Sequence, residues 1–418
     1  PAALPVIEIP EFHFTKVAPL FSNLPEAKHS TDIQPMEQFN QGWGTILYRT
    51  TLPETTLAGT TLKITEVHDW AQIYADGKLL ARLDRRKGEF TTTLPALKKG
   101  TQLDILVEAM GRVNFDKSIH DRKGITEKVE LISGNQTKEL KNWTVYNFPV
   151  DYSFIKDKKY SDTKILPTMP AYYKSTFTLD KVGDTFLDMS TWGKGMVWVN
   201  GHAMGRFWEI GPQQTLFMPG CWLKEGENEI LVLDLKGPTR ASIKGLKKPI
   251  LDVLREKAPE THRKDGEKLK LTGEKVGHEG AFTPGNGWQE VRFATPVKGR
   301  YFCLEALSPQ ANDNIAAIAE FDVLGADGKP VSREHWKIRY ADSEETRSGN
   351  RTADKIFDLQ ESTFWMTVDN VPYPHQLVID LSKVENVTGF RYLPRAEKGY
   401  PGMIKEYRVY VKPADFNY

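Results

Sequence analysis

The chain has 418 residues, and its 56 Lys and Arg against 55 Asp and Glu leave a net charge of +1 at pH 7. This balance creates no broad field for nucleic acid or for an anionic membrane, so it favours a neutral partner. No stretch reaches the ~18 consecutive apolar residues of a membrane span, and two cysteines, Cys221 and Cys303, are too few for a disulfide scaffold or a Cys-rich zinc site.

At roughly 150 residues per domain, the length predicts about three domains. Along the chain, short apolar alternations rich in Val, Ile, Tyr and Trp are separated by Gly, Asn, Asp and Pro clusters, which predicts strands and turns. Residues 72–83 and 196–207 each read as two strands joined by an Asp-Gly or Asn-Gly turn. We therefore predict an all-β chain.

The two predicted hairpins belong to an internal repeat. Gly77 and Gly201 occupy the same turn position and lie 124 residues apart. Segments before and after the hairpins match at nearly the same offset: 48–52 with 173–177, and 100–107 with 226–232. Chance similarity between hairpins would explain each match but not the shared offset, so we predict two related domains.

A polar stretch follows the repeat, and a third β-rich region follows that stretch. The third region has strand-like runs at 336–340, 375–381 and 407–411, and its length suits one sandwich. The predicted organisation is a connector at 1–34, a first β domain at 35–150, a second at 151–254, a linker at 255–270 and a third domain at 271–418.

Common catalytic and metal-binding motifs are missing from the sequence. It contains no HExxH, GxSxG, P-loop or paired CxxC, and its nine histidines show no i, i+3 or i, i+4 pair. A glycosidase needs two carboxylates about 5 to 9.5 Å apart. Asp184 and Asp188 would face the same side of one strand, but a solvated strand face explains this pair better.

Aromatic side chains are the other candidates for ligand contact, because the apolar C–H face of a sugar can lie on an aromatic ring. The candidates by residue type and context are Trp43, Trp70, Trp192, Trp208, Trp288 and Trp365. Aromatic residues at strand ends more often close the core of a sandwich, so we expect only a minority of these to meet a ligand.

Several long segments carry a family resemblance: 36–50, 108–114, 121–125, 184–189, 192–201 and 205–216. They resemble the C-terminal β domains of family 35 glycoside hydrolases, the β-galactosidases. The resemblance implies two galactose-binding-type jelly rolls behind an N-terminal (β/α)8 barrel that carries both catalytic glutamates. That barrel is missing here, residues 1–34 read as the connector from it, and no catalytic residue is assigned to any position of this sequence.

The third region carries a second resemblance, through segments 353–365, 374–381, 392–395 and 404–411. They resemble the discoidin, or coagulation-factor C-type, sandwich of many sugar-binding modules. The strands that usually close such a domain resemble 299–308 and 315–324, which here come first. We therefore predict a circularly permuted discoidin-like domain, an arrangement that is feasible where chain ends lie close together on a surface.

The discoidin resemblance implies a structural calcium held by Asp358, Thr363 and Glu320, whose oxygens suit a hard cation. Leu359 replaces the glycine that usually follows the aspartate, a change expected to deform the loop. No other cofactor is expected.

The third domain is also the expected place of sugar contact. The predicted carbohydrate-binding residues, all in loop-like surroundings, are Tyr373, His375, Arg395 and Tyr400. The alternative is that they are ordinary turn residues.

Together these observations predict a non-catalytic accessory and carbohydrate-binding region of a secreted β-galactosidase. The parent reaction implied by the resemblance is retaining hydrolysis of terminal β-galactosides, and this chain alone should be inactive. The expected partners are a β-galactoside or another neutral glycan and the missing catalytic barrel, in a periplasmic or extracellular location. Two alternatives stay open: an independent galactose-binding, lectin-like module, and a purely structural scaffold that binds neither sugar nor calcium.

Overall fold

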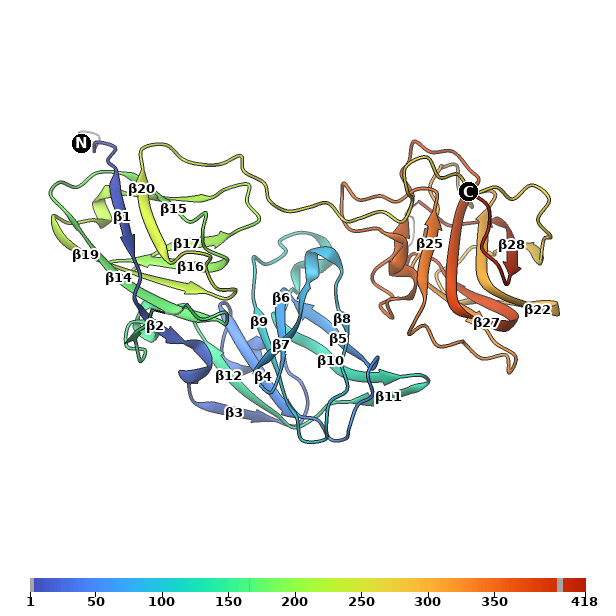
Figure 1. Ribbon diagram of the computed structural model, residues 1–418, viewed down its shortest axis with the longest axis horizontal. Helices are drawn as coiled ribbons and strands as arrows, with labels where there is room; N and C mark the ends of the chain where they lie inside the picture. The colour runs from blue at the N-terminus through green and yellow to red at the C-terminus, as the bar shows by residue number, and fades with distance from the viewer. Residues whose placement is uncertain (1–3, 165, 397–400) are drawn as a thin grey trace. The chain divides into compact units, whose positions relative to one another are not determined.

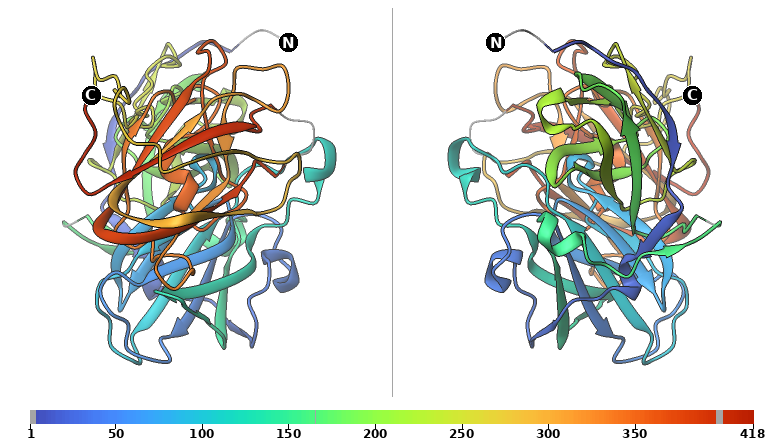
Figure 2. Two further views of the ribbon diagram at one scale, coloured as in Figure 1. Left: turned by 90° about the vertical axis from the view of Figure 1, so that its right-hand side faces the viewer. Right: turned by 90° about the vertical axis from the view of Figure 1, so that its left-hand side faces the viewer.

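The computed structural model describes residues 4–164, 166–396 and 401–418. Within them strands and loops dominate, as Figure 2 shows from two sides, and α1 (Tyr152–Ile155) is the one α-helix. Among these residues, no helix combines the length and hydropathy needed to span a membrane. The all-β prediction is therefore confirmed.

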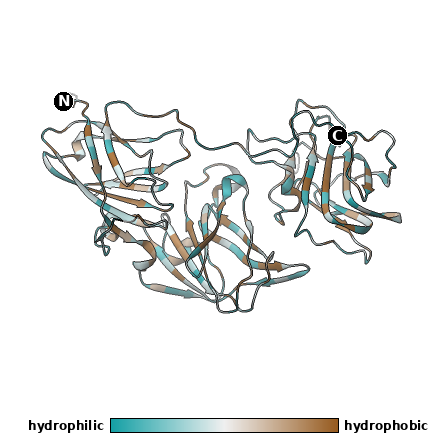
Figure 3. Ribbon diagram, in the orientation of Figure 1, coloured by the Kyte–Doolittle hydropathy of each residue, from teal (hydrophilic) through white to brown (hydrophobic). Residues whose placement is uncertain are grey.

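The strands form because apolar and polar side chains alternate along them, as the colours of Figure 3 show. In β5 (Thr61–His68), for example, Leu62 and Ile64 are buried, whereas Thr61 and Lys63 are partly exposed. Such an alternation gives each sheet one face that packs on a core and one face that meets solvent.

Two compact units make up the chain and are described separately. One comprises residues 1–28, 43–46 and 145–257, and the other residues 29–42, 47–144 and 258–418. The first unit contains two antiparallel sheets, with strand orders β1-β20-β15-β18 and β13-β2-β14-β19-β16-β17. Their bounds are β1 (Ile9–His13), β20 (Ser242–Leu246), β15 (Thr185–Asp188), β18 (Thr215–Met218), β13 (Ser161–Asp162), β2 (Lys16–Pro19), β14 (Ala171–Leu179), β19 (Gly226–Asp234), β16 (Lys194–Val199) and β17 (His202–Trp208).

Aromatic rings fill the core of this first unit. Trp192 makes edge-to-face contacts with Phe14 and Tyr173, at centroid distances of 5.0 and 5.1 Å. Its indole Nε1 donates to the carbonyl of Ser242 at 3.0 Å, so the buried ring has its one polar atom satisfied.

The region around residues 29–144 also has two antiparallel sheets. Their strand orders are β3-β12-β4-β9-β6-β7 and β11-β10-β5-β8. Besides β5, the bounds are β3 (Ala27–Ser30), β12 (Trp143–Phe148), β4 (Thr45–Thr51), β9 (Gln102–Glu108), β6 (Trp70–Ala75), β7 (Lys78–Asp84), β11 (Gln136–Glu139), β10 (Gly124–Ser133) and β8 (Thr91–Thr93).

The predicted repeat is visible in the strand order. The run β4-β9-β6-β7 in one six-stranded sheet corresponds to β14-β19-β16-β17 in the other. The two hairpins share one register irregularity, between Ile73 and Tyr74 in β6 and between Val197 and Trp198 in β16. An offset of 124 residues thus relates the hairpins down to a single bulge, which confirms that two related folds lie in one chain.

The C-terminal region, the third region of the chain, forms a further sheet of order β21-β28-β22-β27-β24, with β25 also paired to β27. The long strands β22 and β27 lie side by side (Figure 1). A separate two-stranded sheet joins β23 and β26. The bounds are β21 (His278–Ala281), β28 (Glu406–Lys412), β22 (Gln289–Ala306), β27 (His375–Leu393), β24 (Glu320–Leu324), β25 (Lys337–Ala341), β23 (Ala317–Ile318) and β26 (Trp365–Met366).

The two ends of this third region are adjacent in space. The backbone N–H of Lys270 donates to the carbonyl of Asn417 at 2.9 Å. The early strand β22 is central, because it pairs with β27 on one side and with β28 on the other. Adjacent ends and an early strand in the middle of the sheet are the features that a circular permutation requires.

Candidate functional site

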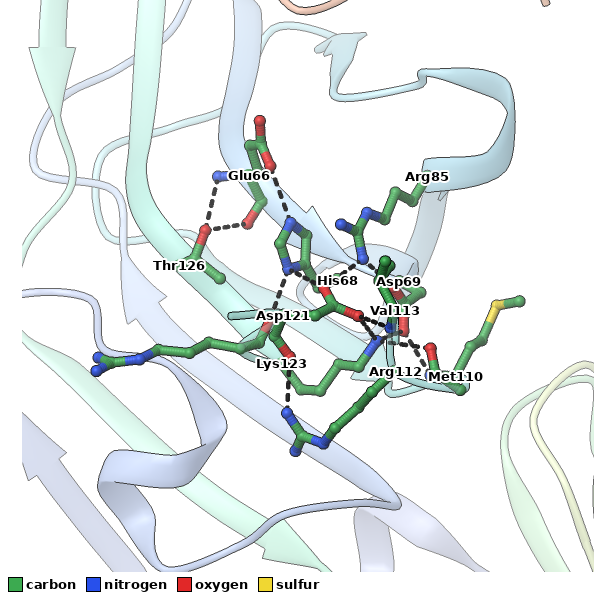
Figure 4. Close-up of polar contacts among 12 residues, drawn as sticks. Glu66, His68, Asp69, Arg85, Met110, Arg112, Val113, Asp121, Lys123 and Thr126 are labelled. Carbon is green, nitrogen blue, oxygen red and sulfur yellow. Dashed lines mark hydrogen bonds and ion pairs between the residues drawn. The ribbon is translucent and has the colours of Figure 1, made fainter. Parts of the chain in front are cut away.

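A cluster of buried charges lies where β5 ends and β6 begins (Figure 4). We call Asp69, Arg85, Asp121 and Lys123 the charge cluster. The fully buried Lys123 donates from Nζ to Asp69 Oδ2 at 2.7 Å, to Asp121 Oδ2 at 2.8 Å and to the carbonyl of Gly111 at 3.1 Å. Arg85 Nη1 donates to the remaining oxygens of both carboxylates, at 2.8 and 2.7 Å. Two cations and two anions thus neutralise one another.

The charge cluster also holds the loop between β9 and β10. Asp69 Oδ2 accepts a hydrogen bond from the backbone N–H of Met110 at 2.6 Å, and Asp121 Oδ2 accepts one from that of Val113 at 3.1 Å. The three ammonium protons of Lys123 have three acceptors within the fold. The cluster therefore fixes the loop to the strand junction.

His68 and Glu66 adjoin the charge cluster. His68 Nε2 lies 2.9 Å from Glu66 Oε2, while its Nδ1 lies 2.5 Å from the carbonyl of Arg122 and 3.3 Å from Asp121 Oδ1. The hydrogen bond with His68 lowers the pKa of Glu66. Both ring nitrogens are thus engaged within the domain.

The chemistry of the cluster is that of a permanent ion network. Burial alone would raise the pKa of Asp121, but hydrogen bonds from Lys123 and Arg85 outweigh burial and bring that pKa to about 2. General acid–base catalysis needs a group that exchanges a proton near the working pH. The cluster is therefore structural. The segments 108–114 and 121–125 carry a family resemblance in the sequence, but no local spacing pairs Asp69 with Asp121.

The two carboxylates considered for hydrolysis each bind backbone. Asp184 Oδ1 accepts a hydrogen bond from the N–H of Gly220 at 2.7 Å, and Asp188 Oδ1 accepts one from that of Ser190 at 3.0 Å. Both carboxylates therefore stabilise the loops beside β15, which accounts for acidic residues at these positions without catalysis.

The three residues predicted to bind calcium lie together in the third domain. Thr363 Oγ1 donates to Asp358 Oδ2 at 2.7 Å. The backbone N–H of Gln360 donates to Asp358 Oδ1 at 3.0 Å and to Glu320 Oε1 at 2.8 Å. Two carboxylates from distant parts of the chain thus accept hydrogen bonds from one backbone N–H, and the Thr363 hydroxyl donates to one of them. We call residues 358–363 the cation loop.

The ionised forms of the two carboxyl groups at the cation loop, those of Glu320 and Asp358, are unfavourable. Burial raises the pKa of Glu320 even though Arg333 contacts it, and burial together with repulsion from Glu320 raises the pKa of Asp358 well above its usual range. Arg333 Nη2 also lies 2.7 Å from Asp322 Oδ1, so its positive charge is shared. A further cation would stabilise the ionised forms of both raised carboxyls.

The oxygens at the cation loop fit a hard cation. Asp358 and Glu320 offer carboxylate oxygens, Thr363 offers a hydroxyl, and the buried Gln360 Oε1 accepts no hydrogen bond among the described residues. Calcium takes about six to eight such oxygens, water included. The described residues contain no group of three or more His, Cys, Asp or Glu side chains suited to a metal, so neutral oxygens and water would complete this set.

The predicted sugar-contact residues differ in accessibility. His375 is fully buried, with Nδ1 2.8 Å from Asp342 Oδ2 and Nε2 2.7 Å from the carbonyl of Asn314. The half-buried Tyr373 donates from its hydroxyl to the carbonyl of Ile315 at 2.7 Å. Both side chains therefore form hydrogen bonds inside the domain.

Arg395 lies in the loop after β27, near β26. The guanidinium of Arg395 lies 4.3 Å from the centroid of the Phe364 ring and is partly exposed. Tyr400 lies outside the described residues. Among the described residues of the predicted set, Arg395 is thus the one with a charged and partly exposed side chain.

The structure sorts the six candidate tryptophans by exposure. Trp70, Trp192 and Trp365 are buried, as expected for core rings, and Trp208 is half-buried. Trp43 and Trp288 are 52% and 36% exposed. Tertiary packing thus decides which of the six rings reach solvent.

Three domain families match the chain. The first all-beta domain of beta-galactosidase matches residues 34–149, the beta-galactosidase galactose-binding domain matches 170–228, and the F5/8 type C domain matches 340–418. The last match begins after β21 to β24, although those strands complete the same domain.

The curated relatives align with about half of this chain. Beta-galactosidase of Bos taurus is 35% identical over 255 residues, 53% of this chain and 37% of that protein. Beta-galactosidase of Xanthomonas manihotis is 33% identical, over 52% of this chain and 35% of that protein. Beta-galactosidase-1-like protein 2 of Homo sapiens is 34% identical, over 47% and 30%. The aligned part of the chain thus spans about a third of each relative's length.

Among solved structures, alpha-L-rhamnosidase of Streptomyces avermitilis aligns with 96% of this chain and 46% of its own, at 9% identity and a TM-score of 0.21. A similarity this low carries no argument about fold or function.

Proposed function

We propose that this chain, which contains the first all-β and galactose-binding domains of β-galactosidases and an F5/8 type C domain, is the accessory, sugar-binding part of an enzyme that hydrolyses terminal β-galactosides. The observation that carries the proposal is the match of two successive β-galactosidase domains in one chain. Because the aligned part spans about a third of the relatives, we assign catalysis to a part of the protein outside this chain.

The described carboxylates support a non-catalytic role. In the charge cluster, Asp69 and Asp121 each form ion pairs with both Lys123 and Arg85. A retaining glycosidase instead needs one carboxylic acid that can donate a proton and one carboxylate that can reach the sugar.

Turnover is the direct test of this role. The purified chain, with its intact mass verified at 47.5 kDa, is assayed with a chromogenic β-galactoside. We expect no hydrolysis by the chain and millimolar binding of methyl β-D-galactoside, equivalent to about −4 kcal/mol. Turnover at the verified mass would overturn the proposal.

Sugar contact in the third domain, predicted for Tyr373, His375, Arg395 and Tyr400, is proposed here without His375, which is fully buried and bonded within the domain. Arg395 supports the proposal best, because it is partly exposed and can donate hydrogen bonds to hydroxyls. We expect Arg395→Ala to weaken galactoside binding. If the double variant Tyr373→Phe, Tyr400→Ala binds like the parent chain, the contribution of the two tyrosines is discarded.

A structural calcium is proposed at Asp358, Thr363 and Glu320. Calcium that binds only the folded state stabilises it by about 2.7 kcal/mol at a hundredfold excess over Kd. We expect calcium to raise the Tm of the chain and a chelator to lower it, with both effects lost in Asp358→Asn. The exposed Asp369→Asn is the matched control, and a chelator effect of equal size in both variants would contradict the assignment.

The two alternative functions make different predictions in the same titrations. A purely structural scaffold binds neither galactoside nor calcium, whereas an independent lectin-like module binds galactoside without any association with a catalytic domain. Adding the catalytic region of the same protein distinguishes the lectin-like module from the proposal, because only the proposed accessory region should associate with it. We further propose a periplasmic or extracellular location, because glycan-derived galactosides are met outside the cytoplasm.

A further inference from the structure

Trp288 is an exposed tryptophan in a polar part of the third domain. It ends the loop 284–288, directly before β22, and 36% of its surface is exposed. It is not part of the domain's buried core, unlike Trp365, which is 1% exposed. A single exposed apolar ring is common on protein surfaces and marks no site by itself. What distinguishes Trp288 is that neighbouring side chains hold the exposed ring in place.

Two neighbouring side chains fix the Trp288 ring. The guanidinium of Arg391 lies 4.6 Å from the ring centroid. Arg391 is itself held by Asp322, since its Nε donates to Asp322 Oδ2 at 2.9 Å. At the ring edge, the indole Nε1 donates to Glu361 Oε1 at 3.3 Å. The ring is therefore positioned before any ligand arrives, which lowers the entropy lost on binding.

The chemistry around the ring suits a neutral sugar. A galactoside has an apolar face of C–H groups that can stack on an aromatic ring, while its hydroxyls need hydrogen-bond acceptors. The exposed Glu361 carboxylate stands at the ring edge, and the charge of Arg391 is already compensated by Asp322. At the ring edge, the carboxylate of an acidic sugar would meet the Glu361 carboxylate.

The loop carrying Trp288 lies beside the proposed sugar-contact residue Arg395. Asn286 Nδ2 donates to the carbonyl of Ala396, the next residue after Arg395, at 3.4 Å. Glu361 belongs to the cation loop, so the three loops that contribute here come from distant parts of the sequence.

We propose that Trp288 is a sugar-stacking platform that takes the apolar face of a neutral β-galactoside, with Glu361 accepting hydrogen bonds from its hydroxyls. This inference rests on the proposed sugar-binding function and adds a contact beside Arg395. The platform discriminates against uronic acids, because their carboxylate is repelled by Glu361.

The test uses the whole chain, titrated with methyl β-D-galactoside and with D-galacturonic acid. Trp288→Ala lowers affinity for the galactoside about tenfold, the loss typical of an aromatic anchor. Phe217→Ala removes a ring from β18 that is 52% exposed, more than Trp288, and leaves the affinity unchanged. Glu361→Gln keeps an acceptor and strengthens binding of the uronic acid relative to the galactoside.

A second measurement follows the Trp288 ring itself in the unsubstituted chain. In the chain labelled with 5-fluorotryptophan, the resonance removed by Trp288→Phe shifts when the galactoside is added. If the galactoside binds the parent chain while Trp288→Ala binds equally well and that resonance stays in place, the platform is refuted and the proposed function stands. If the parent chain binds no galactoside, both the platform and the proposed sugar binding fail.

Discussion

Lys123 is a fully buried cation, and its effect on stability depends on its partners. Removing an ammonium group from water costs several kcal/mol, and only close opposite charges with further hydrogen bonds offset that cost. Here two carboxylates and one carbonyl surround the Lys123 ammonium group. Loss of the cation would leave Asp69 and Asp121 buried with Arg85 as their shared counter-charge.

We expect Lys123→Met to destabilise the chain by about 3 to 5 kcal/mol, because two buried carboxylates lose a partner. Urea unfolding, followed by circular dichroism, measures the change. Lys138→Met is the control: Lys138 forms a solvent-exposed pair with Glu54 and should contribute less than about 1 kcal/mol. Similar losses in both variants would mean that the charge cluster has no special role.

Asp121 should make stability depend on pH in the acid range. Its pKa is about 2 in the folded chain, below the ~3.9 of an unfolded aspartate. The unfolded state therefore binds the proton first, so the contribution of Asp121 is complete above pH ~4 and is lost as pH falls towards 2. Asp121→Asn should flatten the pH dependence of urea midpoints across this window, and an unchanged slope would exclude the coupling.

At the scale of elements, the cation loop places a leucine in a backbone conformation that glycine adopts more easily. Leu359 has φ of +64°, a left-handed conformation that costs a non-glycine residue about 1 kcal/mol. The loop therefore keeps this conformation although leucine replaces the usual glycine. The bonds of Gln360 to Asp358 and Glu320 hold it in place.

Substitution of Leu359 isolates that backbone cost. Leu359→Gly should be more stable than Leu359→Ala by about 1 kcal/mol, since both variants lose the leucine side chain but only glycine relaxes the positive φ. Urea unfolding of both variants, with and without calcium, measures this difference in the free energy of unfolding. Equal stability of the glycine and alanine variants would show that the loop is not strained.

At the scale of the whole molecule, we infer a duplication in the first two regions and propose a circular permutation in the third. Two regions repeat one strand order, and each hairpin carries the same bulge. The third region instead has its early strand β22 between β27 and β28, and its ends meet at Lys270 and Asn417. Its sheet thus depends on segments from both ends of the domain.

The permutation predicts that the third domain tolerates a conventional strand order. In a reordered chain, residue 270 continues into Gly328, Tyr418 is joined to Leu271 by a short Gly-Ser linker, and the chain ends at Asp327. The new opening lies in an exposed turn, closed by a 2.8 Å bond from Gly325 N–H to Lys329. We expect this chain to keep its cooperative thermal unfolding and the native core resonances of the third domain.

Opening the same domain elsewhere provides the control. A cut between Phe302 and Cys303 interrupts β22, where each residue pairs with strands on both sides. That variant should lose the third domain's protected amides. Failure of the Asp327 opening together with the β22 opening would argue against permutation.

The sequence by itself determined the strand-rich fold and the repeat, because alternation and Asn-Gly or Asp-Gly turns act over a few residues and recur at a fixed offset. It also identified Asp358, Thr363 and Glu320 as one group through resemblance. Tertiary structure alone decided that Lys123 joins Asp69 across 54 residues of chain, that His375 is buried, and that Trp288 is exposed while Trp365 is not. These outcomes depend on how distant segments pack, since burial and charge pairing are set by neighbours in space and not by neighbours in the sequence.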